Sequence, residues 1–241
     1  MDGLCMQSPN SFLDADEIRA ATFIRHVEIH DTLSSTNDRA AELARNPDIE
    51  LPALVAARIQ TAGRGRGKNV WHAFDGALTF SILIDSAAHG IGTANWPQLS
   101  LATAVAVCDA ISPELNSQSK RSLRAAAGNP QSEHLSIKYP NDVLLNGEKV
   151  CGILVESPGG ERPAKDRLII GIGINVNNSW RHTKNETTNN RAALCDVTGR
   201  SHSLGSLLIR LIDALNERMR QLSRNDRQLL GILEILVAPI G

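Results

Sequence analysis

Residues 54–84 read LVAARIQTAGRGRGKNVWHAFDGALTFSILI. The apolar runs at 54–59 and 77–84 have the composition of β-strands, and a loop rich in glycine and arginine separates them. Glycines let a backbone pass close to a ligand, and arginines present fixed, forked donors to carboxylates and phosphates. Residues 60–71, called the clamp loop below, therefore predict a ligand-binding loop between two strands. The alternative is a solvated basic hairpin tip.

The composition is that of a globular protein with a sizeable core. The chain has 241 residues, 42% of them hydrophobic, which suits one large domain or two small ones. Its 25 basic and 26 acidic residues give a net charge of −1, so the basic clamp loop is a local feature. General nucleic-acid binding is therefore not indicated. Aromatic residues make up only 3%, which argues against a platform for base stacking.

Cysteine and histidine spacing predicts neither a disulfide framework nor a metal site. The cysteines at positions 5, 108, 151 and 195 form no CxxC pair, and we expect thiols of a reducing compartment. His26 and His30 lack the glutamate placement of HExxH, so no metal held by protein side chains alone is expected. The N-terminus has no signal-peptide pattern, and the longest apolar run is too short to span a membrane. A cytoplasmic protein without a membrane partner is expected.

The apolar patterns predict about seven strands and three longer helices. The strands are expected near residues 27, 54, 77, 137, 143, 149 and 168, and the helices near 37, 96 and 204. Asn146 and Gly147 predict a hairpin between two of the strands. Because the helices alternate with groups of strands, the pattern favours an α+β fold. This fold is a mixed, mostly antiparallel sheet backed by helices.

The remaining polar motifs each allow a structural and a functional interpretation. Ser35 and Thr36 open a helix, where we favour hydroxyl caps over a pocket rim. Lys138 and Lys149 either place their amines in a binding site or protect a sheet edge from aggregation. The alternating glycines of residues 171–173 predict that another group packs closely on one face of a buried strand.

Two common nucleotide-binding motifs are excluded. A Walker A loop would need glycine at position 62 and serine or threonine at 69, where the chain has Ala62 and Asn69. The glycines at 171 and 173 lack both the third glycine and the following helix of a dinucleotide-binding fingerprint. The clamp loop is therefore expected to bind anions in another way.

Five blocks in series resemble the biotin protein ligases. They are Ser-Thr-Asn at 35–37, Gln-x-x-Gly-Arg-Gly-Arg at 60–66 with Trp71, Lys-Tyr-Pro-Asn-Asp at 138–142, Gly-Ile-Leu-Val-Glu at 152–156 and Gly-Ile-Gly-Ile-Asn at 171–175. One such motif is weak evidence, whereas five in order are specific. The resemblance implies the fold shared by class II synthetases and biotin or lipoate ligases. Gly-Lys-Asn-Val-Trp at 67–71 is more similar to the corresponding stretch of the holocarboxylase synthetases.

The resemblance implies a two-step reaction. Biotin's carboxylate attacks the α-phosphate of Mg-ATP, giving biotinyl-5′-AMP and pyrophosphate. A lysine of a biotin carboxyl carrier protein or domain then attacks the mixed anhydride and releases AMP. Biotin and Mg-ATP are thus expected as substrates, with no permanently bound cofactor. No DNA partner is expected, and a homodimer is left open.

The resemblance also implies roles for individual residues. Ser35, Thr36 and Gln60 are expected at the ureido head of biotin, and Lys138 between carboxylate and α-phosphate, assisted by Lys149. The implied catalytic residues are Lys138 and Arg66. The implied biotin-binding residues are Ser35, Thr36, Asn37, Gln60, Gly63, Arg64, Gly65 and Gly152. The implied nucleotide-binding residues are Arg64, Arg66, Trp71, Lys138, Lys149 and Asn175.

Three departures from the family pattern are visible. Tyr139 replaces the usual tryptophan, and residues 116–133 have the character of an insertion. An irregular lead at 1–25 and a catalytic domain at 26–222 are expected. A short apolar tail at 223–241 stands where relatives usually have a small β-barrel domain.

Two rival functions remain open at the sequence level. One is a lipoyl or octanoyl transfer enzyme of the same broad fold, against which the complete clamp and Lys-Tyr-Pro-Asn-Asp argue. The other is a non-catalytic paralogue that binds biotin or its adenylate.

Overall fold

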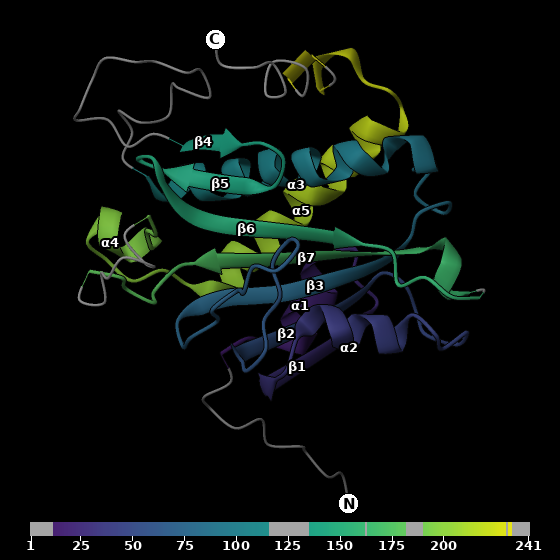
Figure 1. Ribbon diagram of the computed structural model, residues 1–241, viewed down its shortest axis with the longest axis horizontal. Helices are drawn as coiled ribbons and strands as arrows, with labels where there is room; N and C mark the ends of the chain where they lie inside the picture. The colour runs from purple at the N-terminus through teal and green to yellow at the C-terminus, as the bar shows by residue number, and fades with distance from the viewer. Residues whose placement is uncertain (1–11, 116–134, 162, 182–189, 230, 233–241) are drawn as a thin grey trace, which may run out of the picture.

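A seven-stranded sheet forms the centre of the described chain (Figure 1). The computed structural model describes residues 12–115, 135–161, 163–181, 190–229 and 231–232. The strand order is β1-β2-β3-β7-β6-β5-β4; β1 and β2 are parallel, and the other neighbouring pairs are antiparallel. The predicted mixed, mostly antiparallel sheet is confirmed. The bounds are β1 His26–Leu33, β2 Ala53–Gln60, β3 Ala77–Asp85, β4 Leu135–Lys138, β5 Asp142–Leu145, β6 Glu148–Glu156 and β7 Arg167–Asn175.

Five α-helices lie wholly within the described residues. They are α1 Ala15–Ala21, α2 Thr36–Leu43, α3 Trp96–Ile111, α4 Leu194–Thr198 and α5 Leu204–Ser223. The helices predicted near residues 37, 96 and 204 are confirmed as α2, α3 and α5. The sequence did not predict α4, because five residues are too few to establish a helical period.

Side chains alternate along the central strands and divide the interior into two layers. One face of β3 carries Leu78, Phe80 and Ile82, which belong to the main apolar core together with buried residues of α3 and α5. Figure 1 shows α3 and α5 behind the sheet, where they cover this face. The opposite face of β3 carries Thr79 and Ser81, because successive strand residues point to opposite sides. Polar groups are thereby directed to the face that carries the clamp loop.

On that second face, α2 covers one end of the sheet. Ala40, Leu43 and Ala44 pack with Val55 and Leu83 in a smaller apolar cluster. The clamp loop crosses in front of the neighbouring strands (Figure 1). The start of α2 and the clamp loop therefore meet over β3, β7 and β6.

Residues 12–25 pack into the main core. The sequence predicted an irregular lead at 1–25, whereas α1 has seven residues and is capped by Asp14. Leu13, Ile18 and Ile24 are each at most 3% exposed and join the main core. A helix this short shows too few apolar positions for its packing to be predicted. The domain limits at 26–222 stay a prediction.

The predicted insertion at 116–133 lies outside the described residues, as do residues 182–189 and parts of the predicted tail at 223–241. No helix in the described ranges is long and apolar enough to cross a membrane.

An ion-pair cluster ties the start of α2 to the edge strand β1. Arg39 on α2 donates from Nε to Glu28 Oε2 at 2.8 Å and from Nη2 to Glu28 Oε1 at 2.9 Å. His30 Nε2 lies 3.0 Å from the same carboxylate. The Arg39 guanidinium lowers the pKa of Glu28 from 4.5 to about 2, against the opposing effect of burial. The cluster thus holds in place the helix that carries the polar turn at residues 35–37.

The Glu28 carboxylate should make folding stability depend on acid pH. Because its pKa is lower in the folded state, its contribution is fully present above pH 4.5 and is lost as the pH falls toward about 2. We expect the free energy of unfolding of wild type to fall toward that of Glu28→Gln over this window, measured by urea denaturation. Glu42→Gln, which removes an exposed partner of Arg39, is the matched control and should keep the wild-type pH dependence. A constant difference between wild type and Glu28→Gln down to pH 2 would contradict this linkage.

Candidate functional site

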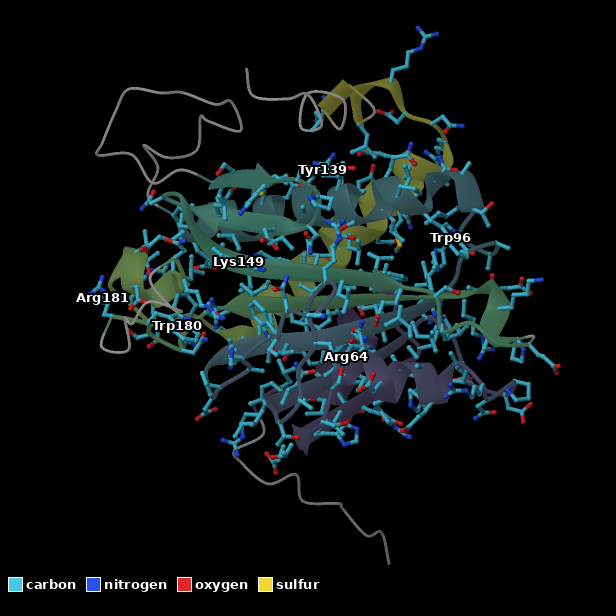
Figure 2. The ribbon with its side chains drawn as sticks, viewed as in Figure 1. Arg64, Trp96, Tyr139, Lys149, Trp180 and Arg181 are labelled. Carbon is cyan, nitrogen blue, oxygen red and sulfur yellow. The ribbon has the colours of Figure 1, made fainter. Side chains whose placement is uncertain are left out.

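A cavity of about 670 Å³ opens on the sheet face that carries the clamp loop. Its lining comes mainly from the start of α2, the clamp loop, Thr79 of β3 and strands β4 to β7. In Figure 2, Lys149 and Tyr139 lie on the β4–β6 side of the sheet, and Arg64 lies on the β1–β3 side. Segments more than 100 residues apart in sequence, at 35–37 and 138–142, therefore contribute to one cavity.

Trp71 lies on a row of small residues in the cavity floor. Thr79, Gly173 and Gly152 are cross-strand neighbours on β3, β7 and β6. A Cβ on Gly173 would overlap the indole of Trp71 and lie 2.6 Å from its Nε1, and one on Gly152 would lie 3.3 Å from its Cζ3. The absence of side chains at Gly173 and Gly152 thus leaves the space that the Trp71 indole occupies. The predicted close packing on the glycine strand is confirmed here.

Asn37 lies on the next row, where Ser81, Gly171 and Leu154 are cross-strand neighbours. A Cβ on Gly171 would overlap Asn37 Oδ1 and lie 2.8 Å from its Cγ. The Asn37 amide accepts from Ser81 Oγ at 2.6 Å and donates to Glu156 Oε2 at 2.7 Å. Asn37 is only 5% exposed, so these partners replace water. Asn37 therefore anchors the turn at 35–37 to the sheet.

The clamp loop itself is a small hairpin. Trp71 N donates to Gly63 O at 2.9 Å, and Gly65 N donates to Asn69 O at 2.8 Å. Gly67 has a φ of +68°, a conformation that favours glycine. A Cβ on Gly63 would overlap the Trp71 carbonyl oxygen. Gly63 is thus required by the close approach of the two hairpin strands, which is a structural reason for this part of the motif.

Neutral polar groups line one part of the cavity. Ser35 Oγ accepts from Asp38 N at 3.4 Å, so the predicted helix cap is confirmed, and the same residue also lines the cavity. Gln60 Oε1 accepts from Thr36 N at 2.6 Å. These bonds use one acceptor on each side chain and leave the Ser35 hydroxyl proton and the Gln60 Nε2 hydrogens as donors. The turn at 35–37 therefore caps the helix and also forms part of the cavity rim, so the two interpretations do not exclude each other.

Two carboxylates hold Arg64. Its Nη1 and Nη2 donate to Glu156 Oε1 and Oε2, each at 2.7 Å, and its Nε donates to Asp38 Oδ1 at 3.0 Å. Burial alone would raise the pKa of Glu156, but hydrogen bonds from Arg64 and Asn37 outweigh it and lower that pKa. The bidentate pair to Glu156 also raises the pKa of Arg64. Arg64 thus has most of its donors directed to protein carboxylates, which the sequence did not predict.

A second part of the cavity is cationic. Five basic side chains among the described residues line the cavity, against the single carboxylate of Asp142; they are Arg64, Arg66, Lys138, Lys149 and Arg191. Lys149 Nζ pairs with Asp142 Oδ1 at 2.7 Å. Within the described chain, the side chains of Lys138 and Arg66 make no ion pair. Because Asp142 and Glu156 offset two of the cations, Lys138, Arg66 and Arg191 carry the charge most available to an anionic ligand.

A family model with the description Biotin/lipoate A/B protein ligase family matches residues 30–175, which is more than half of the chain. The chain belongs to this family. The matched range contains all five sequence blocks and every strand of the described sheet except the first four residues of β1. The resemblance drawn from the motifs is confirmed at the family level.

Similar curated proteins carry the names of ligases. The Bifunctional ligase/repressor BirA of Bacillus subtilis is 35% identical over 196 residues, covering 81% of this chain and 54% of that protein. The Biotin--[acetyl-CoA-carboxylase] ligase of Paracoccus denitrificans is 38% identical over 142 residues, covering 59% of this chain and 51% of that protein. The chain spans about half the length of these curated relatives.

A solved structure supports the same fold. The biotin protein ligase from Aquifex aeolicus in complex with biotin and ATP matches with a TM-score of 0.63 and 26% identity, covering 83% of this chain and 73% of that chain. The predicted class of fold, an α+β sheet domain of the biotin ligase type, is confirmed.

The structure brings most of the predicted family residues to one cavity, but not all. Gly63 and Asn175 do not line it. Asn175 is 99% buried; its Nδ2 donates to Lys149 O at 3.4 Å, and its Oδ1 accepts from Asn178 at 2.9 Å. Its amide is therefore engaged in the protein, and a nucleotide contact by Asn175 stays a prediction. The predicted residues that do line the cavity are Ser35, Thr36, Asn37, Gln60, Arg64, Gly65, Arg66, Trp71, Lys138, Lys149 and Gly152.

Sequence reasoning missed several residues of the site. Ser81 and Glu156 bind site residues from beneath the cavity, and Thr79 and Arg191 line it. Glu156 ends the Gly-Ile-Leu-Val-Glu block, so a charged residue at the end of an apolar strand was the available signal. Ser81 has no such signal, since a serine in an apolar strand has no fixed meaning. In the described ranges, no group of three His, Cys, Asp or Glu side chains is placed to hold a metal.

Proposed function

We propose that this protein is a biotin–protein ligase. It activates the carboxylate of biotin with Mg-ATP and transfers the biotinyl group to a lysine of a biotin carboxyl carrier protein or domain. The single observation that carries the proposal is a cavity with two chemically different parts. Neutral donors and acceptors at residues 35, 36 and 60 suit a cyclic urea, and the cations at 66 and 138 suit a carboxylate and a phosphate.

The proposed first step joins two anions. A carboxylate oxygen of biotin forms a bond to the α-phosphorus of ATP, and the bond to pyrophosphate breaks. Lys138 and Arg66 have the charge to offset both anions and the negative charge that develops on the α-phosphoryl oxygens. Mg²⁺ enters with ATP as part of the substrate and offsets charge on the phosphates. Lys149, paired with Asp142, contributes less because its charge is already compensated.

The proposed second step is acyl transfer. The amine of the carrier lysine attacks the acyl carbon of biotinyl-5′-AMP, the bond to the phosphate oxygen breaks, and AMP leaves. The amine loses a proton to give a neutral amide. The exposed rim residues Val70 and Tyr139, which are 58% exposed, lie at the cavity where the carrier would approach. The carrier is part of the proposal and follows from the proposed chemistry.

Biotin is favoured over lipoate as the acid. The family description covers both, but the similar curated protein of Paracoccus denitrificans carries the name of a biotin ligase. A dithiolane or alkyl head would leave the hydroxyl proton of Ser35 and the Nε2 donors of Gln60 unpaired in the cavity. An unpaired buried polar group costs about 1–3 kcal/mol. The polar part of the cavity therefore disfavours the rival acids.

The test is to incubate the purified chain with biotin, MgATP and a biotin carboxyl carrier domain. We expect a mass increase of one biotinyl group on the carrier and none on a carrier with its target lysine changed to arginine. Adenylate formation is followed separately from radiolabelled ATP. Intact biotin binding without adenylate would support the non-catalytic paralogue instead. Labelling with lipoate or octanoate in place of biotin would support the other rival.

A further inference from the structure

A continuous hydrogen-bonded series runs from the clamp loop to the polar part of the cavity. Arg64 donates to Glu156, which also accepts from Asn37 Nδ2 at 2.7 Å. Asn37 Oδ1 lies 2.6 Å from Ser81 Oγ, which lies 2.8 Å from Thr36 Oγ1. Thr36, Asn37 and Ser81 are at most 5% exposed. The series is therefore largely shielded from water, and its members must satisfy one another.

The chemistry of the groups fixes the direction of each bond. The carboxylate of Glu156 only accepts, so the amide of Asn37 must present Nδ2 to it and Oδ1 to Ser81. An amide oxygen also only accepts, so it takes the one proton of the Ser81 hydroxyl. The contact between Ser81 and Thr36 must then use the Thr36 proton. The Thr36 oxygen is left with lone pairs and no proton for the cavity.

We infer that Ser81 and Glu156 are positioning residues that make Thr36 Oγ1 an acceptor for an N–H group of the ligand. This inference rests on the proposed function, because it assigns hydrogen-bond directions within the proposed biotin pocket. Ser35 and Gln60 keep donors beside that acceptor. The pocket is thus set to receive a carbonyl flanked by N–H, which is the pattern of a cyclic urea. Neither Ser81 nor Glu156 needs to touch the ligand to exert this selectivity.

The test compares biotin with its two cyclic carbamate analogues, in each of which one ureido N–H is replaced by oxygen. Calorimetric titration gives the ratio of dissociation constants. We expect wild type to bind biotin about a hundredfold more tightly than at least one analogue. That analogue loses the N–H that donates to Thr36 Oγ1, and its ring oxygen then faces Thr36 Oγ1 as a second acceptor. In Ser81→Ala, the Thr36 hydroxyl can rotate and donate to the analogue. The preference should then fall to about tenfold.

Glu156→Gln is an independent variant of almost unchanged shape. Its amide can donate to Asn37, which allows every later bond in the series to reverse, so the same loss of preference is expected. Glu156→Gln also weakens the hold on Arg64. Because biotin and its analogues share the same carboxylate tail, this effect changes both dissociation constants equally and leaves their ratio unchanged. In a Thr36→Val background, Ser81→Ala should not change the ratio further. The control is Ser86→Ala, another buried serine, whose hydroxyl bonds Asp166 O and lies outside the cavity.

The outcomes separate this inference from the proposed function. If wild type does not bind biotin, the proposed function fails. If wild type prefers biotin, and both Ser81→Ala and Glu156→Gln keep the full preference, the proposed function stands and the inference is overturned. Should Ser81→Ala fail to fold by circular dichroism, Glu156→Gln alone decides.

Discussion

Gly171→Ala is expected to abolish tight biotin binding and to weaken the fold. The new Cβ would overlap Asn37 Oδ1. Asn37 is only 5% exposed, so its side chain has no room to move away. Displacing Asn37 breaks its bonds to Ser81 and Glu156 and leaves buried groups unpaired, at about 1–3 kcal/mol each. We expect the free energy of unfolding to fall by about 2–4 kcal/mol and biotin affinity to fall at least about a hundredfold.

Urea denaturation and calorimetric titration measure the two effects of Gly171→Ala. Gly205→Ala is the control: its Cβ would have its nearest neighbour at 3.9 Å and lies within α5, where alanine is tolerated. Combining Gly171→Ala with Asn37→Ala removes the overlap, so stability should partly recover while biotin affinity stays low. If Gly171→Ala keeps both the wild-type unfolding midpoint and wild-type biotin affinity, the described packing of Asn37 on the strand is incorrect.

Lys138→Ala is expected to slow adenylate formation about a hundredfold, the usual effect of removing one positioned donor to a developing charge. Lys138 ends β4 opposite Asp142 and is exposed to the cavity. Within the described residues it has no carboxylate partner, whereas Lys149 is paired with Asp142 at 2.7 Å. Its charge is therefore free for the reacting anions. Biotin affinity, set largely by the polar part of the cavity, should change little.

Single-turnover adenylation with radiolabelled ATP checks this expectation. Lys165→Ala removes an exposed lysine outside the cavity and should leave the rate unchanged. Lys149→Ala should have a smaller effect than Lys138→Ala. An unchanged adenylation rate in Lys138→Ala would remove Lys138 from its proposed role.

The local features of the fold could be predicted from the sequence. Apolar runs placed the strands, the Asn146–Gly147 signal placed the hairpin between β5 and β6, and Ser35 marked the start of α2. These features depend on residues a few positions apart, where backbone preferences and periodicity decide the structure. The order of the strands depends on distant contacts, and the sequence gives no comparable local rule for it.

The site could be predicted as a set of motifs but not as a network. The salt bridge of Arg64 to Glu156 spans 92 positions, so nothing local reveals that the clamp arginine has a protein partner. The glycines at 171 and 173 predicted close packing, but only the cross-strand register shows that Asn37 fills one seat and Trp71 the other. Asn175 matched the family motif, yet it ends β7 with its amide engaged inside the protein.

The two glycine rows also limit how this site can change during evolution. Asn37 and Gly171 occupy a shared volume, as do Trp71 and Gly173, although each pair is separated by about 100 residues or more of chain. A larger residue on the strand is tolerable only if its counterpart becomes smaller at the same time. A single substitution of either glycine by a larger residue is therefore expected to be destabilising, because its side chain would overlap Asn37 or Trp71. Variation should appear as matched exchanges of size across the two pairs.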